Sequence, residues 1–471
     1  MTRRVAPDLC VIGAGSGGLA VAAGAAQMGA EVVLIERALM GGDCLNFRCV
    51  PSKSLLAAAR SAHLPCHGPA LGITAAPPCI DFGAVIDSVH EVIARIAPHD
   101  SVERFEGLGV KVLRAEAHFT SPRTVQAGEI EIRPRRFVIA TGSHPAIPSI
   151  PGLDGVPYLT NETVFANRER PMHLVVIGGG PIGVEMAQAH CRLGAQATVL
   201  DVGPLLPRDD PELVTCLTER LASEGIQTRP QIEIAGIERS GKAIVVCLDG
   251  GERIEASHLL VAAGRRPTIE GLDLPAAGIE ATATGITVDA RLRTTNRRAF
   301  AIGDVAGGPQ FTHIALYHAG IVIRNALFRL PAKVDYRALP WVTYTDPELA
   351  QVGLTEPAAR AGGAIPHVLR WPFVENDRAQ TERETTGLVK AVLDSNGRIL
   401  GASMLGAGAG DLVLPWALAI SRKLKIGALA NLIVPYPTRG EASKRAAACY
   451  YTPQLFSPRT RRLVGFLARF G

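Results

Sequence analysis

One structural unit is written twice in this chain: an apolar strand, a glycine-rich turn, a helix, and a second strand that ends in an acidic residue. The first copy starts with the apolar run at 9–12 and ends at Glu36, and the second starts at 174–177 and ends at Asp201. Each acid stands 23 residues beyond the first glycine of its turn. This order and spacing are typical of dinucleotide-binding βαβ units. The sequence therefore predicts two such modules.

The glycines of each turn have separate tasks. The first permits the tight turn, the second lets the backbone approach a pyrophosphate, and the third lets the helix pack on the strand. The phosphates then lie at a helix N-terminus, and the acid binds ribose hydroxyls. The alternative is a glycine-rich turn without a ligand, which is harder to accept for two copies than for one. The candidate glycines are Gly13, Gly15 and Gly18 in the first turn, and Gly178, Gly180 and Gly183 in the second.

Three further apolar strands end in small or acidic residues, at 138–142, 259–264 and 300–304. Ligands of open α/β sheets bind at the carboxyl ends of the strands. The residues at these ends are therefore candidate cofactor contacts, namely Thr141, Gly142, Gly264, Gly303 and Asp304.

The length of 471 residues predicts roughly three domains. A proline-rich stretch at 145–157 suits an inter-domain crossing, and from about residue 335 alternating runs with a turn at Asn396-Gly397 indicate antiparallel strands. Helices are expected around 412–423 and 439–450. We predict an α/β fold of two Rossmann-like dinucleotide-binding domains at 1–150 and 151–270, a return to the first domain at 271–335, and an α+β domain at 336–471.

Composition narrows the function classes. A net charge of +5 is too mild to favour nucleic acid, and no apolar stretch of about 20 residues suggests a membrane span. The basic start runs directly into the first strand, so a signal peptide is not expected. Nine scattered cysteines do not resemble a secreted disulfide framework. These features predict a reducing, cytoplasmic setting.

Cys44 and Cys49 lie in the run Gly41–Lys53. A regular helix separates residues i and i+5 by about 8.7 Å, whereas a disulfide needs Cα atoms within roughly 7 Å. If the pair is bonded, the chain here cannot be a relaxed helix throughout. The alternative is two unrelated buried thiols. The two nucleotide modules and nearby Lys53, whose charge would favour a thiolate, make a redox couple the preferred interpretation.

Across nearly its whole length the chain resembles the flavoprotein pyridine nucleotide-disulfide oxidoreductases, which include dihydrolipoamide dehydrogenase, glutathione reductase and mercuric reductase. The motifs occur in the family's order: the first glycine fingerprint, GGDCLNFRCVPSK, ATG, the second fingerprint, AIGD and TDPELAQVGLTE.

The resemblance implies FAD on the first module, with Gly42 beside it and Asp304 on the ribityl chain, and a nicotinamide dinucleotide on the second module. It implies that Cys49 faces the flavin, that Cys44 faces the substrate, and that Lys53 lies near the flavin N5 edge, paired with Glu185. It also implies a homodimer formed through the C-terminal domain.

One position departs from the disulfide reductases of this family. They carry His-Pro-Thr near the C-terminus, followed by a glutamate, and this chain has Tyr436 in place of the histidine, with Glu441 after it. A tyrosine with a pKa near 10 is a poor acid-base partner for thiols at neutral pH, where histidine, near 6.5, is a good one. Mercuric reductases also carry a tyrosine in this region. They deliver the metal through a C-terminal Cys-Cys pair, which the matching part of this sequence lacks.

We therefore expect an acceptor other than a large dithiol, and favour a metal ion such as Hg(II). The runner-up is a disulfide or lipoamide-type reductase that uses Glu441 or water in place of the histidine. Quinones, a membrane protein partner and a non-enzymatic flavin-based redox sensor are the remaining alternatives.

Two smaller expectations concern the ligands. Asp201 should bind the ribose 2′-OH and repel a 2′-phosphate, which favours NADH, although Arg208 lies close enough in sequence to soften that repulsion. The tail at 459–471 predicts a basic amphipathic helix. Such a helix lies on an anionic membrane or packs against its own domain or the dimer mate.

Overall fold

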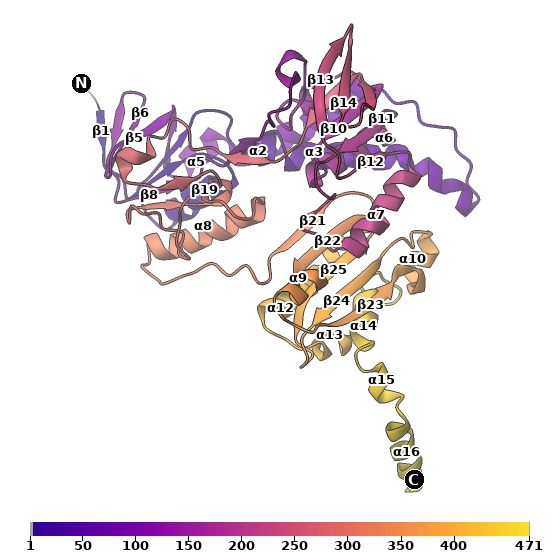
Figure 1. Ribbon diagram of the computed structural model, residues 1–471. Helices are drawn as coiled ribbons and strands as arrows, with labels where there is room; N and C mark the ends of the chain where they lie inside the picture. Colours follow the sequence, from indigo (N-terminus) through magenta and orange to yellow (C-terminus); the bar gives the residue numbers. More distant parts are fainter. Residues whose placement is uncertain (1–2, 471) are drawn as a thin grey trace.

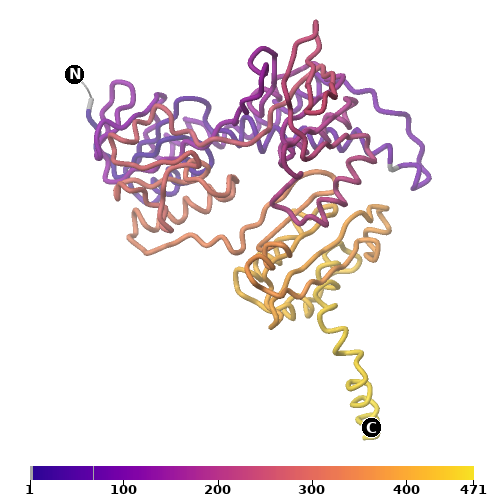
Figure 2. Tube along the Cα trace, in the orientation of Figure 1, coloured from indigo at the N-terminus to yellow at the C-terminus, as the bar shows by residue number. Residues whose placement is uncertain are grey.

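The computed structural model describes residues 3–470 (Figures 1 and 2). Its first sheet is parallel and five-stranded, in the order β20-β8-β2-β3-β4. Short runs of Val, Leu, Ile and Phe form these strands, because both faces of a parallel sheet are covered. The strands are β2 Leu9–Ile12, β3 Val32–Glu36, β4 Val110–Arg114, β8 Arg136–Ile139 and β20 Ala299–Ala301.

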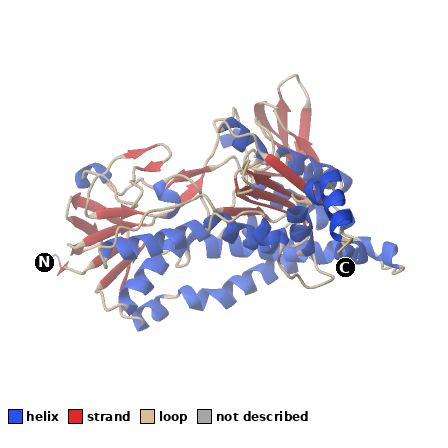
Figure 3. Ribbon diagram, turned by 90° about the horizontal axis from the view of Figure 1, so that it is seen from below, coloured by secondary structure: helices blue, strands red, loops and turns tan. Residues whose placement is uncertain are grey.

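After the second module, the chain returns to the first sheet and forms strand β20. It pairs with β8 and is followed by α8 (Thr312–Ala326), which packs against α1 (Ser16–Gln27). Figure 3 shows helices running alongside these strands. The remaining helices of this part are α2 Gly42–Asn46, α3 Cys49–His63, α4 Phe82–Ile96 and α5 Val102–Gly107. A small four-stranded sheet also belongs to this part of the chain. Its strands, in sheet order, are β1 Arg3–Val5, β7 Ile130–Ile132, β6 Thr124–Ala127 and β5 Ala117–Ser121.

The second module repeats this design with a four-stranded parallel sheet, β12-β11-β10-β16. Its elements are β10 His173–Ile177, β11 Gln196–Leu200, β12 Gln227–Arg229, β16 His258–Val261, α6 Pro181–Arg192 and α7 Pro211–Ser223. An antiparallel sheet of β13 Ile234–Ser240, β14 Ala243–Leu248 and β15 Arg253–Ala256 is inserted before β16. A pair formed by β9 (Ser143–Pro145) and β17 (Arg265–Pro267) joins the two modules.

The C-terminal domain is built on a five-stranded antiparallel sheet, β21-β22-β25-β24-β23. The predicted Asn396-Gly397 turn connects two of its strands, and Gly397 has φ +74° there. The strands are β21 Pro340–Thr343, β22 Glu348–Gly353, β23 His367–Pro372, β24 Leu388–Leu393 and β25 Ile399–Gly406. The helices are α9 Glu356–Ala361, α10 Asp377–Glu382, α11 Ala409–Leu412, α12 Leu414–Ser421, α13 Gly427–Ala430, α14 Glu441–Ala448, α15 Thr452–Leu455 and α16 Pro458–Leu467.

The predicted fold class is confirmed: two Rossmann-like modules are followed by an α+β domain. The helix expected around 412–423 is divided between α11 and α12, and the one expected at 439–450 is the shorter α14. Among residues 3–470, no helix is both long and apolar enough to cross a membrane.

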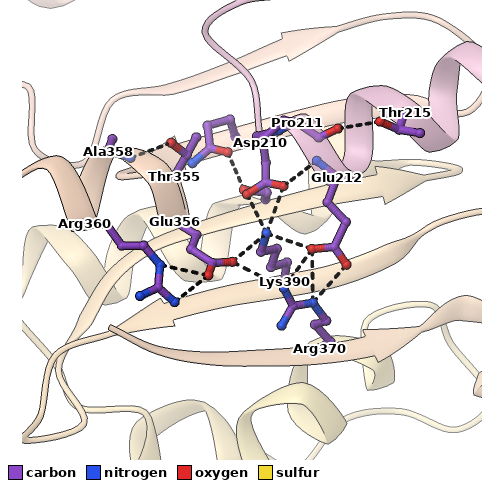
Figure 4. A network of polar contacts seen from close by, with 12 residues as sticks. Asp210, Pro211, Glu212, Thr215, Thr355, Glu356, Ala358, Arg360, Arg370 and Lys390 are labelled. Atoms are coloured by element: carbon purple, nitrogen blue, oxygen red, sulfur yellow. Dashed lines mark hydrogen bonds and ion pairs between the residues drawn. The ribbon is translucent and has the colours of Figure 1, made fainter. Parts of the chain in front are cut away.

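A buried lysine ties the second module to the C-terminal domain (Figure 4). Lys390, on β24, is 2% exposed, and its Nζ lies 2.9 Å from Asp210, 2.8 Å from Glu212 and 3.0 Å from Glu356. Burial lowers the pKa of Lys390, but the hydrogen bonds to these three carboxylates raise it above its ordinary value. Asp210 also caps α7, so the cluster fixes the start of that helix against the sheet.

We predict that Lys390→Met destabilises the protein, by about 3–5 kcal/mol, because it leaves three carboxylates facing one another without the buried cation. Thermal unfolding followed by circular dichroism measures the effect. Lys242→Met, at an exposed position, is the matched control and should leave the melting temperature unchanged. Equal melting temperatures for the two variants would show that the cluster contributes no net stability.

Candidate functional site

A cavity of about 290 Å³ opens at the carboxyl edge of the first sheet. Its wall combines segments that are far apart in the sequence, because β2, β3, β8 and β20 all end there. Eight of the predicted cofactor contacts line it: Gly13, Gly15, Glu36, Gly42, Thr141, Gly142, Gly303 and Asp304. Cys44 and Thr312 line the same cavity.

The glycine geometry fits a dinucleotide. A Cβ on Gly13, at φ +101°, would lie 2.4 Å from the carbonyl oxygen of Ala140, and one on Gly18 would lie 1.9 Å from that of Gly13. Only glycine fits at these two positions, because any side chain would collide with the protein backbone. Around Gly15 the nearest atom would be 4.0 Å away, so its backbone faces open space, as approach to a pyrophosphate demands.

The second turn repeats this pattern. A Cβ on Gly183 would lie 1.9 Å from the carbonyl oxygen of Gly178, and a Cβ on Gly180 would meet nothing within 4 Å. Gly264, three residues beyond the end of the neighbouring strand β16, has φ +118° and also faces open space. Both turns therefore combine two glycines fixed by packing with a middle glycine left open for a ligand.

The two acids brace their turns through hydrogen bonds to backbone N–H groups, and Glu36 also lines the cavity. Glu36 accepts a hydrogen bond from the N–H of Ala14 at 2.6 Å, and Asp201 accepts one from the N–H of Gly179 at 2.5 Å. The second oxygen of each accepts from a backbone N–H two residues further on, at 2.7 Å in both modules. An ionised carboxylate has lone pairs left for ribose hydroxyls.

The two thiols lie on either side of a helix break. Helix α2 ends at Asn46 and α3 begins at Cys49, and Phe47 and Arg48 between them have φ near −137° and −139°. The run is therefore not one relaxed helix, which is what pairing of thiols five residues apart requires. Both cysteines are half-buried free thiols in the structure, and the Cys44 thiol donates a hydrogen bond to Cys49.

Cys49 is the thiolate of the pair. Its pKa is lowered to about 6, chiefly by the hydrogen bond from Cys44, and further by Thr312 and the charges of Arg48 and Lys53, against the opposing effect of burial. The hydroxyl of Thr312 lies 3.2 Å from Cys49 Sγ. Cys49 is also the first residue of α3, where the helix dipole favours a negative charge. The pKa of Cys44 is raised, first by the same hydrogen bond and then by burial.

Lys53 and Glu185 come together as the resemblance implies. Lys53 Nζ donates to Glu185 Oε2 at 2.9 Å, across the boundary between α3 and α6. The other carboxylate oxygen of Glu185 accepts from the N–H of Tyr344 at 2.9 Å, and Lys53 lies 4.2 Å from the centre of the Tyr344 ring. Tyr344 follows β21, so three parts of the chain meet at one carboxylate.

Sequence reasoning missed a half-buried polar network that includes residues of the cysteine motif. Arg265, which follows Gly264, donates to Ser143 at 2.8 Å and lies 3.0 Å from Asp43. Ser143 in turn donates to Asp304 at 2.7 Å, and Arg48 lies 3.4 Å from the same carboxylate. Arg48 and Arg265 could have been found from the sequence, because Arg48 lies inside the cysteine motif and Arg265 follows the predicted Gly264. No sequence feature pointed to Thr312.

Tyr436 and Glu441 lie apart from this site within one chain. Figure 1 places α14, which Glu441 begins, far from α2. Tyr436 is exposed, and its hydroxyl donates to Asp377 at 2.8 Å, which raises the pKa of the phenol above its ordinary value. Glu441 pairs with Arg445 at 2.9 Å. Neither residue can meet Cys44 of its own chain, so a role there requires a second subunit.

Comparison with known proteins gives a consistent result. The family described as pyridine nucleotide-disulphide oxidoreductase matches residues 7–319, and its dimerisation domain matches residues 339–447. A mercuric reductase from Streptomyces lividans is 37% identical over 455 residues, with 94% of this chain and 96% of the relative covered. A dihydrolipoyl dehydrogenase from Bacillus subtilis is 34% identical, with 93% and 95% covered.

Among solved structures, the Cu(II) complex of the HOCl-induced flavoprotein disulfide reductase RclA from Escherichia coli is similar to this chain. The TM-score is 0.85 at 28% identity, with 93% of this chain and 98% of that chain covered.

We predict that the thiolate of Cys49 appears with a midpoint near pH 6 and disappears below it, since its pKa is about 6. The ultraviolet thiolate absorbance of the reduced protein, taken as the difference between wild type and Cys49→Ser, measures this titration. Thr312→Val should raise the midpoint by about 1 pH unit, because it removes one hydrogen bond to the thiolate. Thr312→Ser keeps the hydroxyl and should keep the wild-type midpoint. A wild-type midpoint near 8.5, the value of an ordinary thiol, would contradict the prediction.

Proposed function

Because the chain belongs to the pyridine nucleotide-disulphide oxidoreductase family, we propose that it carries electrons from NADH through Cys44 and Cys49 to a metal ion such as Hg(II). It is an FAD-containing, NAD(P)H-dependent oxidoreductase, and its dimerisation domain supports a homodimer. In the proposed reaction, NADH and Hg(II) give NAD⁺, elemental mercury and one proton, so two electrons leave the nicotinamide and both reach the metal.

Tyr436 is the observation on which this choice of acceptor rests. Reduction of a disulfide substrate needs a group that delivers a proton to the leaving thiolate near neutral pH. Tyr436 keeps its proton there, because its hydrogen bond to Asp377 raises the pKa of the phenol further. A metal ion has no leaving thiol to protonate, so it does not need an imidazole at this position.

The thiol pair suits a soft metal. Thiolates are the preferred ligands of soft, thiophilic metal ions, and metal binding displaces the thiol proton. Cys49 is a thiolate near neutral pH, and the Cys44 thiol is its hydrogen-bond donor. Among the described residues, no group of three or more His, Cys, Asp or Glu side chains is placed to hold a resident metal. Hg(II) would therefore be a substrate held by two sulfurs.

FAD, when bound in the cavity of the first module, would supply two-electron transfer between the nicotinamide and the sulfur pair. In our proposal the backbone at Gly15 approaches the pyrophosphate, Glu36 binds the adenosine ribose, and Asp304 holds the ribityl chain. Gly42, Thr141, Gly142 and Gly303 complete the wall. Lys53 holds a positive charge near the sulfur pair, and buried Glu185 fixes that lysine.

NADH is the proposed nicotinamide donor, bound at Gly178, Gly180, Gly183 and Gly264. Asp201 holds a carboxylate at the ribose position of this module, and its hydrogen bonds to Gly179 and Gly203 keep it there. A 2′-phosphate would meet that charge at short range. Both oxygens of Asp201 accept hydrogen bonds from backbone N–H groups, and no ion pair between Arg208 and Asp201 occurs among residues 3–470.

The second candidate is a lipoamide or disulfide reductase. The similarity to dihydrolipoyl dehydrogenase supports it, and Glu441 or water would then replace the missing histidine. However, Glu441 is paired with Arg445 and is acceptor-only when ionised, so it is a poorer proton donor than an imidazole.

A steady-state screen tests the proposal. Oxidation of NADH and NADPH is followed with Hg(II) in the presence of excess thiol, lipoamide, oxidised glutathione and quinones. We expect Hg(II) to give the highest kcat/KM, at least tenfold above the dithiol substrates, and NADH to exceed NADPH. A lipoamide rate above the Hg(II) rate would favour the second candidate, and a tenfold preference for NADPH would refute the assignment of Asp201.

We further predict that Tyr436→Phe lowers acceptor turnover, by roughly tenfold or more for the loss of one hydroxyl contact, because the phenol donates a hydrogen bond to a thiolate that holds the acceptor at the partner's site. The half-reaction from NADH should be unchanged, and rapid mixing without acceptor measures it separately. Tyr450→Phe, in the same domain, is the control. Turnover equal to wild type would show that Tyr436 only fills the position of the histidine.

A further inference from the structure

The C-terminal helix α16 (Pro458–Leu467) projects away from the rest of the chain (Figure 1). None of its residues is buried, although the helix is regular and begins with a Ser457 cap that accepts from the N–H of Thr460. An exposed helix of ten residues draws little stability from its own hydrogen bonds, so a surface that covers one of its faces would add to its stability.

One face of this helix is apolar. Phe466 and Leu467 lie three and four residues after Leu463 and share one face of the helix, and Phe470, just beyond the helix end, continues this stripe by its contact with Phe466. All four are more than half exposed, from 53% for Phe466 to 75% for Phe470. The rings of Phe466 and Phe470 touch edge to face, with centroids 5.1 Å apart. Large apolar side chains gathered on one exposed face mark an interaction surface.

The segment 458–470 is also cationic. Arg459, Arg461, Arg462 and Arg469 lie between residues 458 and 470, and this stretch has no Asp or Glu. Four of the five net positive charges of the whole chain thus lie in this short tail. Among the described residues, none of these four arginines is paired with a carboxylate. Uncompensated arginines beside a Phe and Leu stripe are typical of helices that lie in the interface of an anionic bilayer.

The position of the helix favours a lipid surface over a second copy of the chain. The match to the family's dimerisation domain ends at residue 447, before α15 and α16 begin. In a symmetric dimer, self-association of this helix would bring two clusters of four arginines together, and the repulsion would oppose the contact. An anionic membrane instead attracts the arginines and takes up the apolar stripe.

We propose that α16 docks this protein on the surface of membranes rich in anionic lipid, with Leu463, Phe466, Leu467 and Phe470 inserted among the acyl chains and the arginines at the phosphates. The long arginine side chains reach the phosphates while the stripe enters the apolar layer. This inference does not depend on the identity of the electron acceptor. Gly471, the last residue of the tail, lies outside the described residues.

Vesicle co-sedimentation of the FAD-loaded enzyme tests the proposal. Vesicles of phosphatidylcholine with phosphatidylglycerol are compared with vesicles of phosphatidylcholine alone, at low and high salt. We expect wild type to bind the anionic vesicles at least tenfold more tightly than the neutral ones, with weaker binding as salt rises, because salt screens the arginines.

Three variants separate the two parts of the surface. Removal of residues 458–471 should abolish binding, and Phe466→Ser with Phe470→Ser should weaken it at least tenfold at unchanged charge. Replacement of Arg461, Arg462 and Arg469 by Gln should weaken binding to anionic vesicles by a similar factor. The matched control replaces three cations of the β13–β15 sheet, Arg239, Lys242 and Arg253, by Gln, and should bind as wild type does.

Flavin content and light-scattering mass confirm that each variant is folded and record its oligomeric state. Equal vesicle binding of the wild type and the truncated enzyme would overturn the proposal. A truncated enzyme that becomes monomeric, together with a wild type that ignores anionic vesicles, would also overturn it and assign α16 to a contact between subunits.

Discussion

The ion pair between Lys53 and Glu185 is the contact on which the arrangement of the site depends. It joins α3, which carries Cys49 at its first residue, to α6, which begins at the glycine turn of the second module. Glu185 is 4% exposed, so its charge is tolerated only while Lys53 and the N–H of Tyr344 satisfy it. The helix of the redox pair, the helix of the nicotinamide module and the C-terminal domain thus all contact the carboxylate of Glu185.

The break between α2 and α3 gives the two sulfurs unequal chemistry. Because the helix restarts at Cys49, that sulfur receives the helix dipole, the Thr312 hydroxyl and the nearby cations, whereas Cys44 acts as the hydrogen-bond donor. An unbroken helix would hold the thiols too far apart and give neither of them the N-terminal position. The network of Arg265, Asp43 and Ser143 then fixes this break against the wall of the cavity.

Much of this could be predicted from the sequence, for reasons that are local. Gly13, Gly18, Gly178 and Gly183 lie where a Cβ would collide with backbone, so their spacing is dictated by short-range geometry that a sequence displays directly. The pairing of Lys53 with Glu185 came from the family resemblance, since nothing local links residues 132 positions apart. Thr312 and Arg265 were missed for the same reason: each reaches the site only after β20 or β16 has joined its sheet. The domain limits and the roles of Tyr436 and Glu441 stay predictions.

In the proposed reaction, delivery of electrons and acceptance of electrons use different parts of the chain. Delivery of electrons to the sulfurs would use residues of one chain, which are positioned by strand ends, glycine turns and the Lys53–Glu185 ion pair. If Tyr436 or Glu441 takes part in acceptance of electrons from Cys44, as we propose, a second subunit is needed, because both residues lie in the C-terminal domain, away from Cys44 of the same chain. A homodimer would bring them to the partner's cavity. The substitution of a single residue in the C-terminal domain could then change the acceptor without disturbing the flavin and nicotinamide sites, which is the relation expected between enzymes that share this fold and differ in substrate.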